Sequence, residues 1–255
     1  MPWDPVQYLA FDAERSRPAL DLLARIPHEA PSQIVDLGCG AGNVTRMARL
    51  RWPTAEILGV DRSPEMLAAA ARACAGVVWQ QADLATWTPE MPVDVIFSNA
   101  ALHWVDDHRS LIPRLLGFLA PGGCLAVQMP RNHDRPSHTT AFELIDARPE
   151  WSRRLAPLLR RGPVLTAEAY LGLVRPLVDR VEVWETDYLH QLNGEDPVLA
   201  WTRGTFLAPL LEALDEADRG SFLNAYKRKL NEAYPPDPAG RTTFRFRRLF
   251  LVARR

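Results

Sequence analysis

The first half of the chain alternates between two patterns of hydrophobic and polar positions. Short, nearly continuous apolar runs have the length of β-strands, and the segments between them place apolar residues at helical spacing. The apolar runs span residues 33–38, 55–61, 77–83, 93–102 and 124–130, and the helical segments span residues 10–26, 43–52, 63–75 and 108–120. Such runs are typical of parallel strands that are covered on both faces. The pattern predicts an α/β fold with a doubly wound, mostly parallel sheet.

The pattern changes after Pro130. Residues 179–192 and 242–255 alternate well enough for two further strands, giving an expected seven-stranded sheet. Two irregular segments, 131–165 and 193–240, read as helical insertions. We therefore expect one domain over residues 1–255 with a ligand-binding core in 30–130. Because late insertions in such folds commonly cover the ligand crevice, both are expected as caps over the substrate site.

Composition narrows the class of protein. The 255 residues are 47% hydrophobic and carry a formal net charge of −1, which indicates a globular chain without a basic nucleic-acid footprint. No run is apolar enough for a signal peptide or a membrane span, so we expect a cytoplasmic protein. Cys39, Cys74 and Cys124 form no CxxC pair, which favours buried reduced thiols over a disulfide framework or a metal site. The oligomeric state stays open.

The segment IVDLGCGAGNVT, residues 34–45, joins a predicted strand to a predicted helix. Gly38, Gly40 and Gly42 suit a turn that needs left-handed backbone or a close ligand, and the helix start offers N–H groups. The dinucleotide fingerprint would require a glycine where Asn43 stands. Asp36 would repel a pyrophosphate and suits a cation such as an ammonium group. Together these residues disfavour a nicotinamide dehydrogenase.

Acidic residues end two further predicted strands. Asp61 stands where dinucleotide folds place an acid that binds ribose hydroxyls, and Asp83 suits an exocyclic adenine amine. A single strand-end aspartate is often only a helix cap or a solvated side chain. Three of them after a glycine turn make a stronger pattern, which predicts a nucleoside with a cationic group.

This pattern resembles the class I S-adenosylmethionine-dependent methyltransferases over about residues 30–130. The resemblance implies S-adenosylmethionine as cofactor and S-adenosylhomocysteine as product. The implied cofactor residues are Asp36, Gly38, Cys39, Gly40 and Gly42 for the methionine end, Asp61 and Arg62 for the ribose, Asp83 and Leu84 for the adenine, and Asn99 along the cofactor. His103 and Trp104 would face the transfer site, with Tyr8 closing over the cofactor. His103 has the alternative role of capping the following turn.

Segments outside this core resemble the trans-aconitate 2-methyltransferase family. They are WDPVQYLAFDAERSRPALDLL near the N-terminus, AVQMPRNHDRPSH, VEVWETDYLHQL and NEAYPPDPAGRTTFRFRRLFLVA. The resemblance covers essentially the whole chain and implies O-methylation of one carboxylate of trans-aconitate. A carboxylate is already ionised at pH 7, so this reaction requires no general base.

The other carboxylates of such a substrate need cationic partners, for which arginine is suited by its planar fork. The candidate substrate-binding residues are Arg15, Arg131, Tyr188, Arg203, Arg245 and Arg247. Arg245 and Arg247 would share one strand face, with Phe244 and Phe246 on the other. For each arginine the alternative is a solvated surface charge, and for Tyr188 it is core packing.

Two further functions remain open from the sequence. The chain could methylate another small carboxylic acid or natural product. It could also be a non-catalytic S-adenosylmethionine-binding module whose late helices serve a protein partner.

Overall fold

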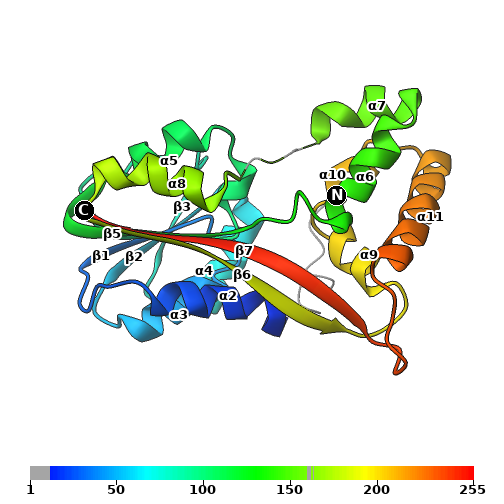
Figure 1. Cartoon of the computed structure of the whole chain (residues 1–255). Helices are drawn as coiled ribbons and strands as arrows, with labels where there is room; N and C mark the ends of the chain where they lie inside the picture. Colours follow the sequence, from blue (N-terminus) through cyan, green and yellow to red (C-terminus); the bar gives the residue numbers. More distant parts are fainter. Residues whose placement is uncertain (1–11, 160–161, 163) are drawn as a thin grey trace. The chain divides into compact units, whose positions relative to one another are not determined.

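The computed structural model describes residues 12–159, 162 and 164–255, with side chains from residue 16 onward (Figure 1). Its sheet has seven strands in the order β3-β2-β1-β4-β5-β7-β6. The strands are β1 (Gln33–Leu37), β2 (Glu56–Asp61), β3 (Val78–Gln81), β4 (Val93–Asn99), β5 (Leu119–Pro130), β6 (Arg180–Leu192) and β7 (Thr242–Arg254). Strands β1 to β5 pair in parallel, and β7 pairs antiparallel with β5. The predicted doubly wound, mostly parallel seven-stranded sheet is confirmed.

The helices follow the predicted order in the first half, and those after β5 vary in length from 5 to 18 residues. The helices are α2 (Asp12–Ala24), α3 (Asn43–Arg51), α4 (Pro64–Ala73), α5 (His108–Gly117), α6 (Pro136–Asp146), α7 (Pro149–Leu155), α8 (Ala167–Val174), α9 (Pro197–Arg203), α10 (Ala208–Glu212) and α11 (Glu216–Ala233), with 3-10 turns η1 (Leu102–Trp104), η2 (Ala156–Leu158) and η3 (Arg175–Leu177). Within the described residues, no helix combines the length and apolar character needed to cross a membrane.

The chain divides into two compact units, and the expected single domain stays a prediction. The sheet unit comprises Arg15–Pro130, Pro163–Thr186 and Arg248–Arg255, and the helical unit includes Arg131–Gly162 and Asp187–Arg247. The predicted insertions, residues 131–165 and 193–240, fall largely within the helical unit. Their role as caps over a substrate site stays a prediction.

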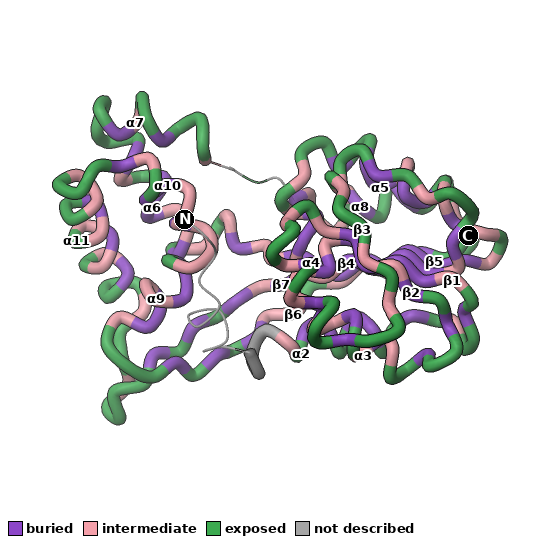
Figure 2. Tube along the Cα trace, turned by 180° about the vertical axis from the view of Figure 1, so that it is seen from behind, coloured by how far each residue is buried: buried purple, intermediate pink, exposed green. Residues whose placement is uncertain are grey.

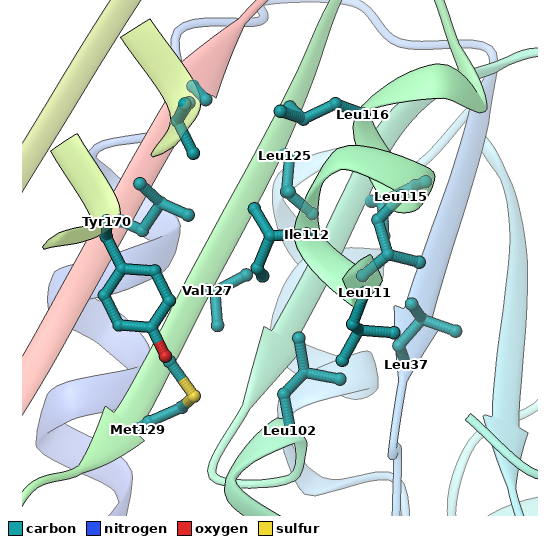
Figure 3. Close-up of a cluster of buried hydrophobic side chains, with 14 of the residues drawn as sticks. Leu37, Leu102, Leu111, Ile112, Leu115, Leu116, Leu125, Val127, Met129 and Tyr170 are labelled. Atoms are coloured by element: carbon teal, nitrogen blue, oxygen red, sulfur yellow. The ribbon is translucent and has the colours of Figure 1, made fainter. Parts of the chain in front are cut away.

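In the sheet unit, α5 and α8 cover one face of the parallel strands, and α2, α3 and α4 cover the other (Figure 1). Leu111, Ile112 and Tyr170 come from the helices of the first face and pack against Val127 and Met129 of β5 (Figure 3). Because β4 and β5 are buried along most of their length (Figure 2), the carboxyl ends of these strands are fixed by a close-packed interior. The strand order reverses beside β1, where β2 and β4 are its two neighbours. Open α/β sheets bind ligands at this switch point.

The helical unit has its own aromatic core. Trp151, Phe222 and Tyr226 are fully buried and pack with Phe244 and Phe246 of β7. The burial of β7 alternates at its start, so the phenylalanines point inward and Arg245 points to solvent. This confirms the predicted two-faced strand.

The strand predicted over residues 124–130 begins earlier in the structure, at Leu119. The Pro-Gly-Gly segment, which the sequence placed between a helix and this strand, therefore lies inside β5, where the register with β4 shifts between Val93 and Val95. A Cβ at Gly123 would lie 2.9–3.1 Å from three backbone carbonyl oxygens. The glycine therefore permits an irregular, closely packed strand where the sequence suggested a loop.

Candidate functional site

Asp61 fixes the loop that follows β1. Its Oδ2 accepts a hydrogen bond from the Gly40 N–H at 2.9 Å, and its Oδ1 accepts one from the Ser63 N–H at 2.9 Å. The N–H groups of Gly38 and Cys39 donate to the Val60 carbonyl of β2 at 2.8 and 3.0 Å. The predicted ribose-binding carboxylate is therefore held in one orientation by two backbone donors at the carboxyl edge of the sheet.

The three glycines of this loop have positive φ values of 81°, 53° and 80°, as the turn prediction requires, but their surroundings differ. A Cβ at Gly38 would lie 2.1 Å from the Ala101 Cβ, and one at Gly42 would lie 3.1 Å from Ala70 and from the Trp79 ring. A Cβ at Gly40 would meet nothing within 4 Å. Protein atoms therefore occupy the space beside Gly38 and Gly42, whereas Gly40 presents open backbone that a ligand can approach.

Asp36 lies beneath this loop rather than on its surface. Its side chain is buried, and its Oδ2 accepts a hydrogen bond from the Thr45 hydroxyl at 2.6 Å. Burial raises the pKa of Asp36 to about 7, and the nearby charge of Asp61 acts in the same direction. The predicted contact with an ammonium group, direct or through water, thus falls on a carboxyl that is only partly ionised at neutral pH. The role of Asp36 toward a ligand stays a prediction.

The loop after β3 carries the residues predicted for the adenine. Asp83 is exposed, and its Oδ1 accepts a hydrogen bond from the Ala85 N–H at 2.8 Å, so it also caps its own turn. Arg114 of α5 holds the same loop by donating to the carbonyls of Leu84, Ala85 and Trp87. The sequence analysis missed Arg114, because an arginine inside an ordinary helix gives no signal of this contact.

Arg62 and Cys39 have different surroundings. Arg62 is exposed at the carboxyl end of β2, where its carbonyl accepts a hydrogen bond from the Gln81 side chain at 3.2 Å. Cys39 is buried, and burial raises the pKa of its thiol above the ordinary value. Cys39 therefore contributes an unreactive thiol and a backbone N–H to the loop.

The carboxyl end of β4 contains buried amides without hydrogen-bond partners. The Asn99 Oδ1 and both side-chain polar atoms of Gln128, its register neighbour on β5, are unpaired within the described residues. Ala100 follows with a φ of 52°, which is strained for a residue with a Cβ, and its N–H donates to the Gln128 carbonyl at 2.9 Å. Unsatisfied buried amides and backbone strain are both uncommon away from functional sites. Gln128 was not among the predicted site residues.

The turn η1 places His103 and Trp104 beside this strand end. Their rings lie 4.8 Å apart, and Trp104 is 42% exposed, which is unusual for a tryptophan. The Leu102 carbonyl of the same turn faces the Nε2 of buried His108 at 2.9 Å, and the His108 Nδ1 contacts the Tyr170 hydroxyl. Burial lowers the pKa of His108. This neutral network, which the sequence analysis missed, fixes the turn that carries His103 and Trp104.

These features fit a sulfonium nucleoside. An oriented carboxylate at Asp61, open backbone at Gly40 and an unpaired amide oxygen at Asn99 lie at the ends of the neighbouring strands β2, β1 and β4, in that order. Neighbouring strands lie about 4.8 Å apart, so these groups are spread along one edge of the sheet, which suits an extended ligand. Among the described residues, no group of three or more histidine, cysteine or acidic side chains is placed to bind a metal ion.

Three of the predicted substrate arginines lie in a charged cluster of the helical unit. Asp187 of β6 accepts hydrogen bonds from the Arg247 Nε at 2.9 Å and from the Arg245 Nη1 at 3.0 Å. The hydrogen bond from Arg247 is the main cause of the lowered pKa of Asp187. Arg135 Nη2 lies 3.9 Å from the same carboxylate, and Arg131 lies in the same segment as Arg135, 3.8 Å from Asp134. Asp187, Asp134 and Arg135 were not predicted.

Among the described residues, no ion pair joins the other predicted substrate residues to this cluster. Arg203 is exposed at the end of α9. Tyr188 is buried and stacks on His190, with ring centroids 6.2 Å apart, which fits core packing. Tyr8 and the side chain of Arg15 lie outside the described part of the chain.

Known proteins similar to this chain include relatives of similar length and a solved structure of similar fold. Residues 34–123 match the family described as a methyltransferase domain. A protein named trans-aconitate 2-methyltransferase from Methylobacterium nodulans is 47% identical over 99% of this chain and 98% of its own length. The protein of that name from Streptomyces avermitilis is 49% identical over 98% of this chain and 96% of its own. The crystal structure of the YcgJ protein from Bacillus subtilis superposes with a TM-score of 0.61 at 16% identity, covering 94% of this chain and 98% of that one.

Proposed function

The chain belongs to the trans-aconitate 2-methyltransferase family of S-adenosylmethionine-dependent methyltransferases, and from this premise we propose that it esterifies one carboxylate of trans-aconitate. The observation that carries the proposal is the oriented Asp61 carboxylate beside the open backbone of Gly40. A carboxylate fixed by two backbone N–H groups keeps further lone pairs for a ribose diol.

We assign the cofactor to residues along the carboxyl edge of the sheet. Asp61 would hold the ribose, the loop of Asp83 and Leu84 the adenine, and Asn99 and the Gly40 backbone the methionine end. When bound, S-adenosylmethionine supplies a methyl carbon that accepts an electron pair from a carboxylate oxygen while the carbon–sulfur bond breaks toward sulfur. No proton moves in this step, which agrees with a reaction that requires no general base.

The remaining task of the protein is to align the reacting oxygen, carbon and sulfur atoms and to exclude water from them. His103 and Trp104 on η1 would bring an aromatic wall to the transfer site, and the network of His108 and Tyr170 would keep that wall in place. A carboxylate oxygen that sheds its water becomes a better nucleophile, and a fixed line of oxygen, carbon and sulfur removes an entropic cost.

The acceptor requires cations for the carboxylates that do not react. We propose that Arg131, Arg245 and Arg247 of the helical unit supply them. The reacting carboxylate loses its charge in the transition state, so a cation bound directly to it would stabilise the ground state more than the transition state. The arginines are therefore expected to act on the carboxylates that keep their charge. We also place the enzyme in the cytoplasm, because Cys39, Cys74 and Cys124 are buried free thiols.

Turnover of a substrate panel tests this function. Purified protein, S-adenosylmethionine and trans-aconitate should give a monomethyl ester and S-adenosylhomocysteine in equal amounts by mass spectrometry, with little product from phenols or amines. Turnover restricted to phenols would contradict the proposal. Tight cofactor binding with no ester from any small acid would favour a non-catalytic binding module instead.

A further inference from the structure

Gln128 of β5 points away from α5 and α8. Its neighbours Val127 and Met129 pack with side chains of those two helices (Figure 3). Successive side chains of a strand point to opposite faces, so Gln128 lies on the face that α2, α3 and α4 cover (Figure 1). The register of β4 with β5 places Asn99 beside Gln128 on the same face. Two amide side chains thus lie together at the carboxyl ends of neighbouring strands.

Asp36 continues this arrangement on β1. Asp36 is the register neighbour of Phe97, which precedes Asn99 by two residues on β4 and therefore shares its face. The hydroxyl of Thr45 on α3 donates to Asp36 from this side. We call Asp36, Asn99 and Gln128 the polar row. All three residues belong to the sheet unit.

Gln128 is the member of the polar row that is hardest to explain by stability. Its side chain is fully buried, and neither the Oε1 nor the Nε2 has a hydrogen-bond partner within the described residues. A buried amide without a partner destabilises a protein, whereas an apolar side chain of similar shape does not. A donor and an acceptor that the fold leaves unused indicate a partner that binds from outside the chain.

The backbone next to Gln128 is also strained. Ala100 has a φ of 52°, and its N–H donates to the Gln128 carbonyl at 2.9 Å. Ala101, the next residue, fills the space beside Gly38. The chain then enters η1, which packs against β5. Such strain is typical of ligand-binding segments, and here it lies between the polar row and the turn that carries the proposed aromatic wall.

The strand order indicates which group of the reactants lies beside Gln128. The proposed cofactor contacts follow the strand ends in the order β3, β2, β1 and β4, from the adenine to the methionine end at Asn99. The next strand in the sheet is β5. A group beside Gln128 is therefore adjacent to the methionine end on the side away from the ribose. The acceptor of the methyl group has to lie on that side.

A neutral amide suits the carboxylate that reacts. One of its oxygens forms the new bond to carbon, the electron pair of the carbon–sulfur bond moves to sulfur, and the carboxylate loses its negative charge. A cation would hold the charged ground state more strongly than the transition state. The second oxygen accepts hydrogen bonds throughout, first as a carboxylate oxygen and then as an ester carbonyl. An uncharged N–H donor to this oxygen therefore orients the group without opposing the reaction.

We propose that the Gln128 Nε2 donates a hydrogen bond to the oxygen of the reacting carboxylate that does not form the new bond. The inference rests on the proposed function and deepens it, because it assigns a residue to the reacting group. Asn99 is half-buried and Gln128 fully buried, so the acid enters beside Asn99 and binding includes a local opening at the end of β5. The buried position then keeps water from the reacting group.

Gln128→Met tests the proposal, because it removes the amide with little change in shape. It should lower kcat/KM for trans-aconitate about 10- to 150-fold, the range for losing a hydrogen bond to a charged group. In isothermal titration with saturating S-adenosylhomocysteine, the Kd for trans-aconitate should rise about tenfold or more. The Kd for S-adenosylhomocysteine should stay unchanged, and the melting temperature measured without ligands should rise. A residue with a merely structural role would lose stability and activity together.

Met129→Leu is the matched control. Met129 is the next residue of β5, is fully buried and faces α5 and α8 (Figure 3). Its replacement nearly conserves volume and should leave kcat/KM and both dissociation constants unchanged. Gln128→Leu removes the same amide and serves as the test if the methionine variant does not fold. Failure of both Gln128 variants to fold would show that the amide has a structural partner, and the proposal would be rejected.

The outcomes separate this inference from the proposed function. A wild type that methylates trans-aconitate, combined with a Gln128→Met variant of unchanged kcat/KM and Kd, would overturn the role of Gln128 and leave the function intact. A weaker Kd for S-adenosylhomocysteine in the variant would assign Gln128 to the cofactor and also overturn it. A wild type that binds trans-aconitate through Gln128 but forms no ester would support the contact and contradict the function.

Discussion

Replacing Asp61 with alanine removes two kinds of interaction that can be measured separately. The carboxylate accepts hydrogen bonds from the N–H groups of Gly40 and Ser63, both at 2.9 Å, and is proposed to accept two more from the ribose hydroxyls. Hydrogen bonds to an ionised partner are worth about 1.5–3 kcal/mol when desolvated, and less at this half-buried position. We expect the variant to lose about 1–2 kcal/mol of unfolding free energy. Separately, it should lose about 1–3 kcal/mol of cofactor affinity, a roughly 5- to 150-fold rise in Kd.

Asp94→Ala is the matched control for the structural part. The Asp94 carboxylate also accepts from two backbone donors, the N–H groups of Ser32 and Gln33 at 2.7 and 3.0 Å, but at the amino end of β1. Both variants should lower the free energy of unfolding in urea by similar amounts. Only Asp61→Ala should weaken the binding of S-adenosylhomocysteine in isothermal titration.

A ligand without one ribose hydroxyl identifies the contact itself. Wild-type protein should bind S-adenosylhomocysteine more tightly than its 2′-deoxy analogue, and Asp61→Ala should bind the two about equally. If the variant kept the full preference for the hydroxyl, Asp61 would not be the ribose partner. If its affinity for S-adenosylhomocysteine were unchanged, the reasoning from strand-end acids would fail.

Three further changes test other parts of the account. Because Asp36 has a pKa of about 7 in the folded chain, the folded chain keeps a proton that the unfolded chain releases between about pH 4 and 7. The free energy of unfolding of the wild type therefore falls as the pH rises through that range. The free energy of unfolding of Asp36→Asn, measured in urea relative to that of the wild type, should therefore rise by about 2 kcal/mol between pH 5 and pH 8. A difference between the two proteins that did not change with pH would contradict a raised pKa of Asp36. Gln128→Met should raise the stability of the ligand-free protein by about 1–2 kcal/mol, because it removes an unsatisfied buried amide, and a lower melting temperature would show that the amide has a partner. Asp187→Ala should lower the free energy of unfolding by about 1 kcal/mol at pH 7, because the ion pairs with Arg245 and Arg247 are lost. Since the pKa of Asp187 is lowered in the folded chain, this difference from the wild type should disappear as the pH falls below 4. A difference that persisted at low pH would show that Asp187 stabilises the fold by packing instead.

The fold was largely predictable because its determinants are local. Continuous apolar runs predicted the parallel strands. The helical segment predicted from residue 63 agrees with α4, whose N-cap Ser63 accepts a hydrogen bond from the Met66 N–H. The alternation of Phe244 and Phe246 with arginines predicted the two faces of β7. The Pro-Gly-Gly segment was misread because a strand irregularity and a turn use the same residues.

The candidate site was only partly predictable, because long-range contacts decide its details. The glycines and Asp61 could be identified, but the occupation of the space beside Gly38 by Ala101 depends on a loop more than sixty positions away. Arg135 and Asp187 gave no signal, since nothing in a sequence shows that an arginine before a proline will meet an aspartate from a distant strand. Such pairs are determined by tertiary packing alone.

A crystal structure of the chain with S-adenosylhomocysteine bound tests the central claim most directly. The account predicts that the ribose hydroxyls lie within hydrogen-bond distance of the Asp61 carboxylate, with the homocysteine backbone beside Gly40 and Asn99. A nucleoside bound away from the carboxyl edge of β1 and β2, with its sugar not in contact with Asp61, would contradict it.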